Sequence, residues 1–76
     1  MSGTERDPVE SRAIEVNGEA REVAAATVAA LVAELGLDPR SVAVERNGAV
    51  VSRPLWPETE VAAGDRIELV RFVQGG

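Results

Sequence analysis

The chain has 76 residues and a net charge of −5, it contains no cysteine, histidine or tyrosine, and all 8 of its positive charges are arginine. The missing side chains are the thiol nucleophile, the Schiff-base amine of lysine, the group that titrates near neutral pH and the soft or imidazole metal ligands, so we expect no catalysis within the chain and no transition-metal site. The acidic balance argues against nucleic acid and against an anionic membrane surface as partners.

A chain of this length forms one domain at most and has little room for a deep pocket. Residues 1–8 lack the apolar core of a secretory signal, and the longest nearly apolar run, residues 23–33, is about half a bilayer span. We therefore expect a cytoplasmic protein. Three acidic residues, Glu58, Glu60 and Asp65, lack the ligand spacing of a calcium loop, so no metal site of that kind is predicted either.

Composition divides the chain into three parts. Residues 1–12 are polar, charged and interrupted by Pro8, which predicts a disordered N-terminal extension. Residues 13–72 carry the apolar patterns of a compact domain, and residues 73–76 are predicted to form a flexible C-terminal tail.

Two β-hairpins are predicted, each around an Asn-Gly dipeptide. The strands are residues 13–16 and 19–23 around Asn17-Gly18, and residues 42–46 and 49–52 around Asn47-Gly48. Asn-Gly favours a type I′ turn, because that turn needs a positive φ at both central residues.

A helix is predicted over residues 27–35, because apolar side chains recur at i, i+3, i+4 and i+7 from Val28. Thr27 is the expected N-cap, and Gly36 is the expected left-handed residue at the other end, after which Leu37 packs back on Val32.

The remainder has one more strand. Residues 53–57 are predicted to be irregular because prolines interrupt them, and residues 58–63 form a connection that holds one helical turn at most. The last strand covers residues 66–72 and is apolar on both faces, which is typical of a central strand. The order hairpin, helix, hairpin, strand predicts an α+β domain, with a mixed sheet of four to five strands and one helix on one face.

The last strand also predicts a docking surface. Ile67 and Leu69 are expected to face the helix, which leaves Val70 and Phe72 on the uncovered face, unless residues 53–57 cover them. Trp56 is either an anchor for a partner or a cover for the core. The predicted partner-docking residues are Phe72, Val70, Arg71 and Trp56.

The tail Val73-Gln74-Gly75-Gly76 carries the strongest functional signal. Glycine has no Cβ and threads channels too narrow for other residues, and four extended residues reach roughly 13 Å at about 3.3 Å each. A terminal carboxylate at Gly76 is ionised and is therefore a poor electrophile, so another enzyme must activate it. The sequence predicts modification at Gly76, with Gly75, Gln74 and Val73 threading a partner's active site.

These patterns together resemble the ubiquitin-like β-grasp proteins, and among them the small sulfur carriers of thiamine-thiazole synthesis. The residues that carry the resemblance are 14–19, Thr27 and Val28 with Leu31 and Leu35, 42–48, 64–70 and 73–76. Each piece is common alone, but five pieces in this order, ending in Gly-Gly, make a specific signal over residues 13–76.

The resemblance implies a carrier and not an enzyme. It implies that a ThiF-like adenylating enzyme uses ATP to activate Gly76, that a sulfur donor protein supplies a thiocarboxylate there, and that a ThiG-like thiazole synthase receives the sulfur. No cofactor is expected to stay bound to the carrier. The alternatives are the small subunit of molybdopterin synthase, another thiocarboxylate carrier, a modifier of protein lysines and an unmodified β-grasp interaction module.

Overall fold

The computed structural model describes residues 11–72, whose strands form one five-stranded mixed sheet. The strands are β1 (Arg12–Val16), β2 (Glu19–Val23), β3 (Val42–Arg46), β4 (Ala49–Val51) and β5 (Arg66–Arg71), in the order β2-β1-β5-β3-β4. β5 pairs in parallel with β1 and antiparallel with β3, so the last strand is central, as its two apolar faces predicted. The predicted α+β fold with one α-helix on a mixed sheet is confirmed.

The first strand begins slightly earlier than the predicted domain boundary at residue 13. Arg12 already pairs with Val23 of β2. Residues 1–10 of the predicted extension lie outside the described residues, as do residues 73–76 of the predicted tail.

Both Asn-Gly turns have the predicted type I′ backbone. Asn17 has a φ of 50° and Asn47 a φ of 53°, and the glycine after each also has a positive φ. The asparagine side chains also form hydrogen bonds to the backbone of β5. Asn17 Oδ1 accepts a hydrogen bond from the backbone N–H of Leu69 at 2.8 Å, and Asn47 Oδ1 accepts one from that of Arg66 at 2.9 Å. Each turn thus also fixes a residue of the central strand.

The helix α1 (Val28–Glu34) has both predicted caps. Thr27 Oγ1 accepts a backbone N–H of the first turn at 3.1 Å. Gly36 has a φ of 73°, and Leu37 N donates to Val32 O at 3.1 Å, the long hydrogen bond of a Schellman motif. The chain therefore leaves the helix sharply and turns back toward the sheet.

The prediction of an irregular segment at residues 53–57 was wrong. This segment is the 3₁₀-helix η3 (Arg53–Glu58), and the helical turn expected within residues 58–63 lies in η3 instead. Proline removes ladder hydrogen bonds but is compatible with the start of a 3₁₀ turn, where its N–H is not needed. A second short 3₁₀-helix, η2 (Pro39–Ser41), precedes β3 and was not predicted.

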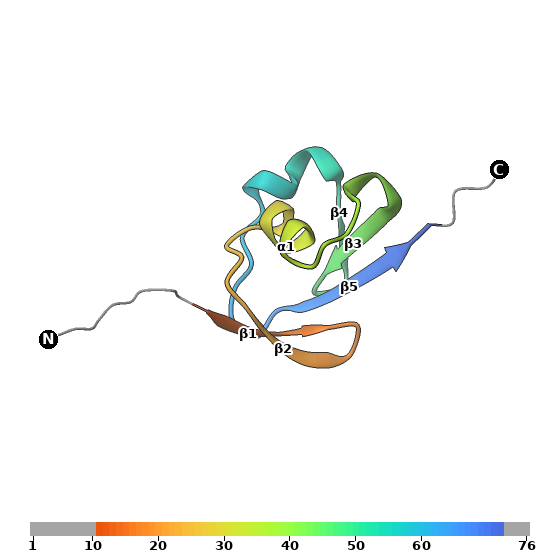
Figure 1. Ribbon diagram of the computed structural model, residues 1–76. Coiled ribbons are helices and arrows are strands. Elements are labelled where there is room, and N and C mark those ends of the chain that lie inside the picture. The colour runs from red at the N-terminus through yellow and green to blue at the C-terminus, as the bar shows by residue number, and fades with distance from the viewer. Residues whose placement is uncertain (1–10, 73–76) are drawn as a thin grey trace, which may run out of the picture.

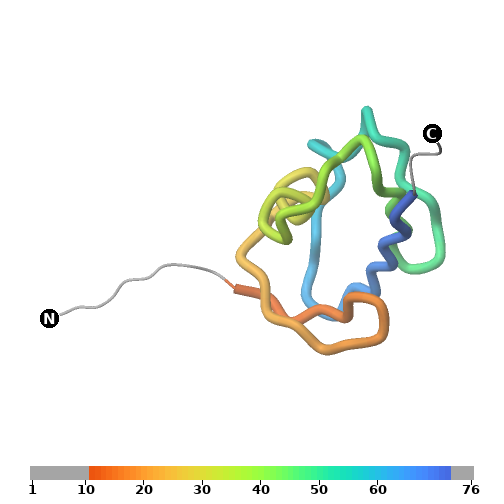
Figure 2. Tube along the Cα trace, turned by 45° about the vertical axis from the view of Figure 1, so that its right-hand side comes forward, coloured from red at the N-terminus to blue at the C-terminus, as the bar shows by residue number. Residues whose placement is uncertain are grey.

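The core lies between the sheet and the helix. In Figures 1 and 2, α1 (yellow) and η3 (teal) lie on the same side of the sheet. The segment after η3 runs beside the start of α1, where Val28 N donates to Thr59 O at 2.9 Å. The buried apolar residues are Ile14, Val16, Val23, Ala25, Val28, Leu31, Val32, Val42, Val44, Trp56, Val61 and Ile67. The core is therefore almost entirely aliphatic.

One buried charge ties the second hairpin to the start of β5. Asp65 is 6% exposed, and its Oδ2 accepts from Arg46 Nε and from Ala62 N, both at 2.8 Å. Its Oδ1 accepts from Asn47 Nδ2 at 3.1 Å. Burial alone would raise the pKa of Asp65, but the hydrogen bonds and the Arg46 charge together hold the pKa below its ordinary value.

We expect Asp65→Asn to lower the free energy of unfolding by about 1–3 kcal/mol at neutral pH, because buried donors lose a charged acceptor. The carboxylate has a lower pKa when folded than the roughly 3.9 of an unfolded chain, so it stabilises the fold above that pH. This contribution is lost as the pH falls through the folded-state pKa. Urea unfolding across this range should show the two proteins converge in acid, and a difference that stays constant with pH would contradict the assignment.

Candidate functional site

The candidate site lies at the C-terminal end of β5, where the last residues of the chain begin. Arg71 is opposite Val42 in the β3 ladder, and Phe72 N donates to Ser41 O at 2.8 Å. The chain is thus held to β3 up to Phe72. The predicted modified residue Gly76 and the predicted threading residues Gly75, Gln74 and Val73 follow directly and lie outside the described residues.

An apolar patch lies on the uncovered face of the sheet and includes Phe72, the last described residue. Val70 is 55% exposed, Phe72 is 50% exposed, and Val50 of the edge strand β4 is 72% exposed. Ala43 lies directly opposite Val70 and joins the patch. The alternative that residues 53–57 cover Val70 and Phe72 is wrong, because η3 lies on the α1 side of the sheet (Figure 1).

Two carboxylates border this apolar patch. Glu45 and Glu68 are directly opposite each other on β3 and β5, and Glu45 is also opposite Val50. Like charges in this position destabilise a sheet. The uncovered face therefore suits a partner whose apolar side chains are flanked by arginine or lysine.

The predicted docking residues do not form one surface. Val70 and Phe72 share the uncovered face, whereas Arg71 alternates to the helix side of the sheet, where it lines a groove with Leu37. Trp56 is only 4% exposed, and its Nε1 donates to Val51 O at 2.8 Å. Trp56 therefore covers the core, which corrects its prediction as a docking residue.

Sequence reasoning missed Val50. The run of residues 49–52 has two adjacent valines, and alternation alone puts Val50 and Val51 on opposite faces without saying which is inward. In the structure Val51 is opposite the buried Val44 and packs against the core, which leaves Val50 on the uncovered face.

The described residues offer few other sites. Within residues 11–72, no three histidine, cysteine or acidic side chains lie close enough to hold a metal ion. In the same range no helix has the length and apolar character needed to cross a membrane. Asp65, one of the three acidic residues singled out in the sequence, is engaged by Arg46.

A mixed five-stranded sheet with one α-helix on one face and a C-terminal strand at its centre defines the ubiquitin-like β-grasp fold. A solved structure agrees: the thiamine biosynthesis protein ThiS from Geobacter metallireducens superposes with a TM-score of 0.72 and 34% sequence identity, over 84% of this chain and 99% of that one. The sequence pattern of the ThiS family matches residues 14–76. The chain belongs to the ThiS family, which confirms the family predicted from the sequence.

Two curated relatives are much longer. The chain is 47% identical over 62 residues to a thiazole synthase of Paramagnetospirillum magneticum, covering 80% of this chain and 19% of that protein. It is 44% identical over 64 residues to a thiazole synthase of Magnetococcus marinus, covering 83% of this chain and 20% of that protein. The chain thus spans about a fifth of the length of these relatives.

Proposed function

We propose that this protein is a sulfur carrier of thiamine biosynthesis, which receives sulfur as a thiocarboxylate on Gly76 and gives it up for thiazole formation. The observation that supports this most directly is the family match, which runs through the tail to residue 76 and does not stop at the folded domain. The proposal requires a free α-carboxyl group at Gly76, and the intact mass of the protein isolated from its source tests that first.

The chemistry divides between the carrier and its enzymes. The Gly76 carboxylate attacks the α-phosphorus of ATP, pyrophosphate leaves, and an acyl adenylate results. A sulfur nucleophile then attacks the carbonyl carbon, the bond to the phosphate oxygen breaks, and AMP leaves. The carrier supplies an unhindered acyl group, because glycine has no side chain near that carbon. ATP is used by the activating enzyme and is not held by the carrier.

The apolar patch is the proposed docking surface for a ThiF-like adenylating enzyme. It lies on the uncovered face, it includes Phe72 and Val70, and Phe72 is the last residue before the tail. An enzyme that holds the patch therefore has the tail at the edge of its binding site. Glu45 and Glu68 would pair with basic residues of that enzyme.

A ThiG-like thiazole synthase is the proposed acceptor. Both curated relatives contain a stretch similar to this chain within a protein named thiazole synthase. A covalent link between two modules raises their effective concentration, which favours modules that act on each other. We place this exchange in the cytoplasm, with a sulfur donor protein supplying the sulfur there.

Intact mass measurement tests the proposed function. The protein is incubated with ATP, magnesium, a ThiF-like enzyme and sodium sulfide, and a mass gain equal to the replacement of one oxygen by sulfur is expected. Addition of a thiazole synthase with its other substrates should reverse this gain. An unchanged mass with a competent enzyme would favour an unmodified interaction module, and high-mass conjugates would favour a protein modifier. Reversal by the large subunit of molybdopterin synthase with its substrate, and not by thiazole synthase, would favour the other carrier pathway.

A further inference from the structure

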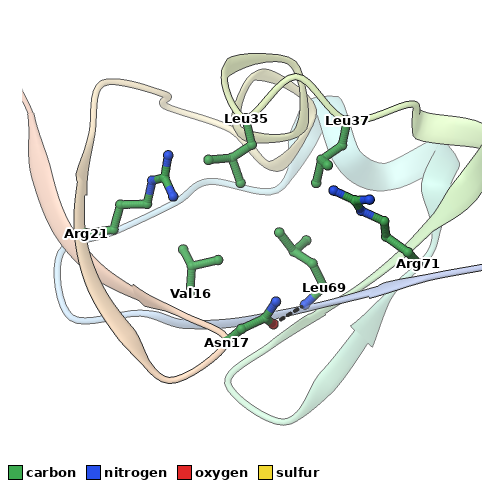
Figure 3. Close-up of a pocket in the computed structure, with 7 residues that line it drawn as sticks. All are labelled: Val16, Asn17, Arg21, Leu35, Leu37, Leu69 and Arg71. Atoms are coloured by element: carbon green, nitrogen blue, oxygen red, sulfur yellow. Dashed lines mark hydrogen bonds between the residues drawn. The ribbon is translucent and has the colours of Figure 1, made fainter.

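A groove opens on the helix side of the sheet, away from the apolar patch. It lies between the β1–β2 hairpin, the end of α1 and β5, and has a volume of about 240 Å³ (Figure 3). Its floor is aliphatic and consists of Val16, Leu35, Leu37 and Leu69. Its polar lining consists of Asn17, Arg21 and Arg71, and contains no acidic residue.

The groove follows from unequal strand lengths. β1 ends at Val16, and its parallel pairing with β5 stops at Ile67, but β5 continues to Arg71. α1 ends at Glu34, so it does not extend over this last part of β5. Leu69, which packs against the core but is only partly buried, and Arg71 therefore line an open groove.

The polar side-chain groups of the groove that have no partner among the described residues are all hydrogen-bond donors. Within residues 11–72, neither Arg21 nor Arg71 has an ion pair or a side-chain hydrogen bond. Asn17 Oδ1 is already engaged by Leu69 N at 2.8 Å, which leaves the Asn17 Nδ2 donor facing the groove. Figure 3 shows the two guanidinium groups on opposite sides of the aliphatic floor, both turned inward.

The nearby acidic side chain of Asp38 does not neutralise these donors. Asp38 lines the adjoining hollow together with Arg71 and Phe72. Its Oδ1 accepts from Arg40 N at 3.0 Å and from Arg40 Nε at 3.4 Å. The Asp38 carboxylate is thus paired with Arg40, and these two hydrogen bonds lower its pKa.

We propose that this groove docks an extended acidic–aliphatic segment of a partner protein, with an aliphatic side chain on the Leu35–Leu69 floor and a carboxylate between Arg21 and Arg71. The rim carries two arginine side chains although the protein has a net charge of −5, and these guanidinium groups complement a carboxylate. The groove lies on the opposite side of the sheet from the apolar patch. The lining of the groove itself shares no residue with the patch, so a protein held in the groove leaves Val50 and Val70 free. The proposal goes beyond the proposed sulfur-carrier function.

The size of the groove supports a protein segment as the occupant. Pockets for small molecules usually measure about 300–1,000 Å³ and enclose most of their ligand. A partly open groove of about 240 Å³ has room for one or two side chains of a peptide segment that lies across it. The groove adjoins the hollow lined by Ser41 and Phe72 through their shared residues Leu37 and Arg71, so such a segment can continue toward the root of the tail.

Titration by ¹H–¹⁵N NMR tests this site on the carrier alone. The probe is an acetylated and amidated peptide of alternating leucine and glutamate. Two control peptides replace either every glutamate by glutamine or every leucine by glycine, and sodium octanoate represents a small aliphatic acid. We expect the leucine–glutamate peptide to shift the amide signals of Asn17, Arg21, Leu37 and Arg71. Each control peptide should bind at least about tenfold more weakly.

Charge-matched variants decide the assignment. Arg21→Gln and Arg71→Gln should each weaken the peptide at least about tenfold, whereas Arg66→Gln, which removes the same charge from the uncovered face, should leave its affinity within about twofold. Equal weakening by all three variants, or signal shifts confined to the uncovered face, would overturn the proposal. Octanoate binding as tightly as the peptide would also overturn it, in favour of a small-acid site. None of these readouts depends on sulfur loading, so the groove proposal can fail while the proposed carrier function holds, and the reverse.

Discussion

A carrier that lacks Gly75 and Gly76 is expected to lose sulfur loading completely, with no detectable mass gain after incubation with ATP, a ThiF-like enzyme and sulfide. The truncated chain would end at Gln74, which carries a side chain. Its terminal carboxylate would lie two residues closer to the folded domain than that of Gly76. Two extended residues span roughly 7 Å, so the new carboxylate falls short of the activation site by that distance. Displacements far smaller than this already cost about a hundredfold in rate.

Folding should be unaffected by this truncation. All the buried apolar residues of the described core lie between Ile14 and Ile67, before the tail begins. The thermal midpoint of the truncated protein should therefore match that of the full chain within about 2 °C. A chain shortened by residues 1–10 is the matched control and should load fully. Full loading without the two glycines would disprove Gly76 as the modified residue, and a large drop in the midpoint would show that the tail belongs to the fold.

The elements that the sequence predicted well are those specified by local chemistry. Asn17 and Asn47 reach the positive φ of a type I′ turn because asparagine and glycine tolerate it. The helix ends at Gly36 for the same reason, and Thr27 caps its start through its own side chain. None of these features needs a partner distant in sequence, so a single sequence is enough to place them.

The features that escaped prediction depend on contacts between distant segments. Trp56 is in the core because Val51 accepts its indole N–H and the start of α1 lies beside η3, and neither contact leaves a periodic signal. Asn17 holds Leu69, which is 52 residues later in the chain.

The groove could not be predicted from the sequence for a related reason. It exists only because β5 is longer than its pairing with β1, a property of the sheet register and not of any one segment. Arg71 was singled out as a docking residue from its neighbours in sequence, yet strand alternation separates it from both of them. Its neighbours Val70 and Phe72 face one side of the sheet and Arg71 faces the other.

The Val70→Glu substitution is expected to slow sulfur loading at least about tenfold at limiting carrier concentration, because an apolar residue of the proposed interface is replaced by a charge that must be desolvated. The new carboxylate would also join Glu45 and Glu68, which already face each other on this surface. The loss should appear as a higher KM for the carrier, since the tail and Gly76 are unchanged. The measurement is the initial rate of loading over a range of carrier concentrations.

Leu55→Glu is the matched control for this test. Leu55 is 51% exposed and Val70 is 55% exposed, so each substitution adds one charge to a similarly exposed aliphatic position. Leu55 belongs to η3 on the α1 side, away from the apolar patch. If the uncovered face docks the activating enzyme, only Val70→Glu raises the KM. If both variants load like the unsubstituted protein, the activating enzyme binds another surface of the carrier, and the apolar patch with Val70 and Phe72 is not its docking surface.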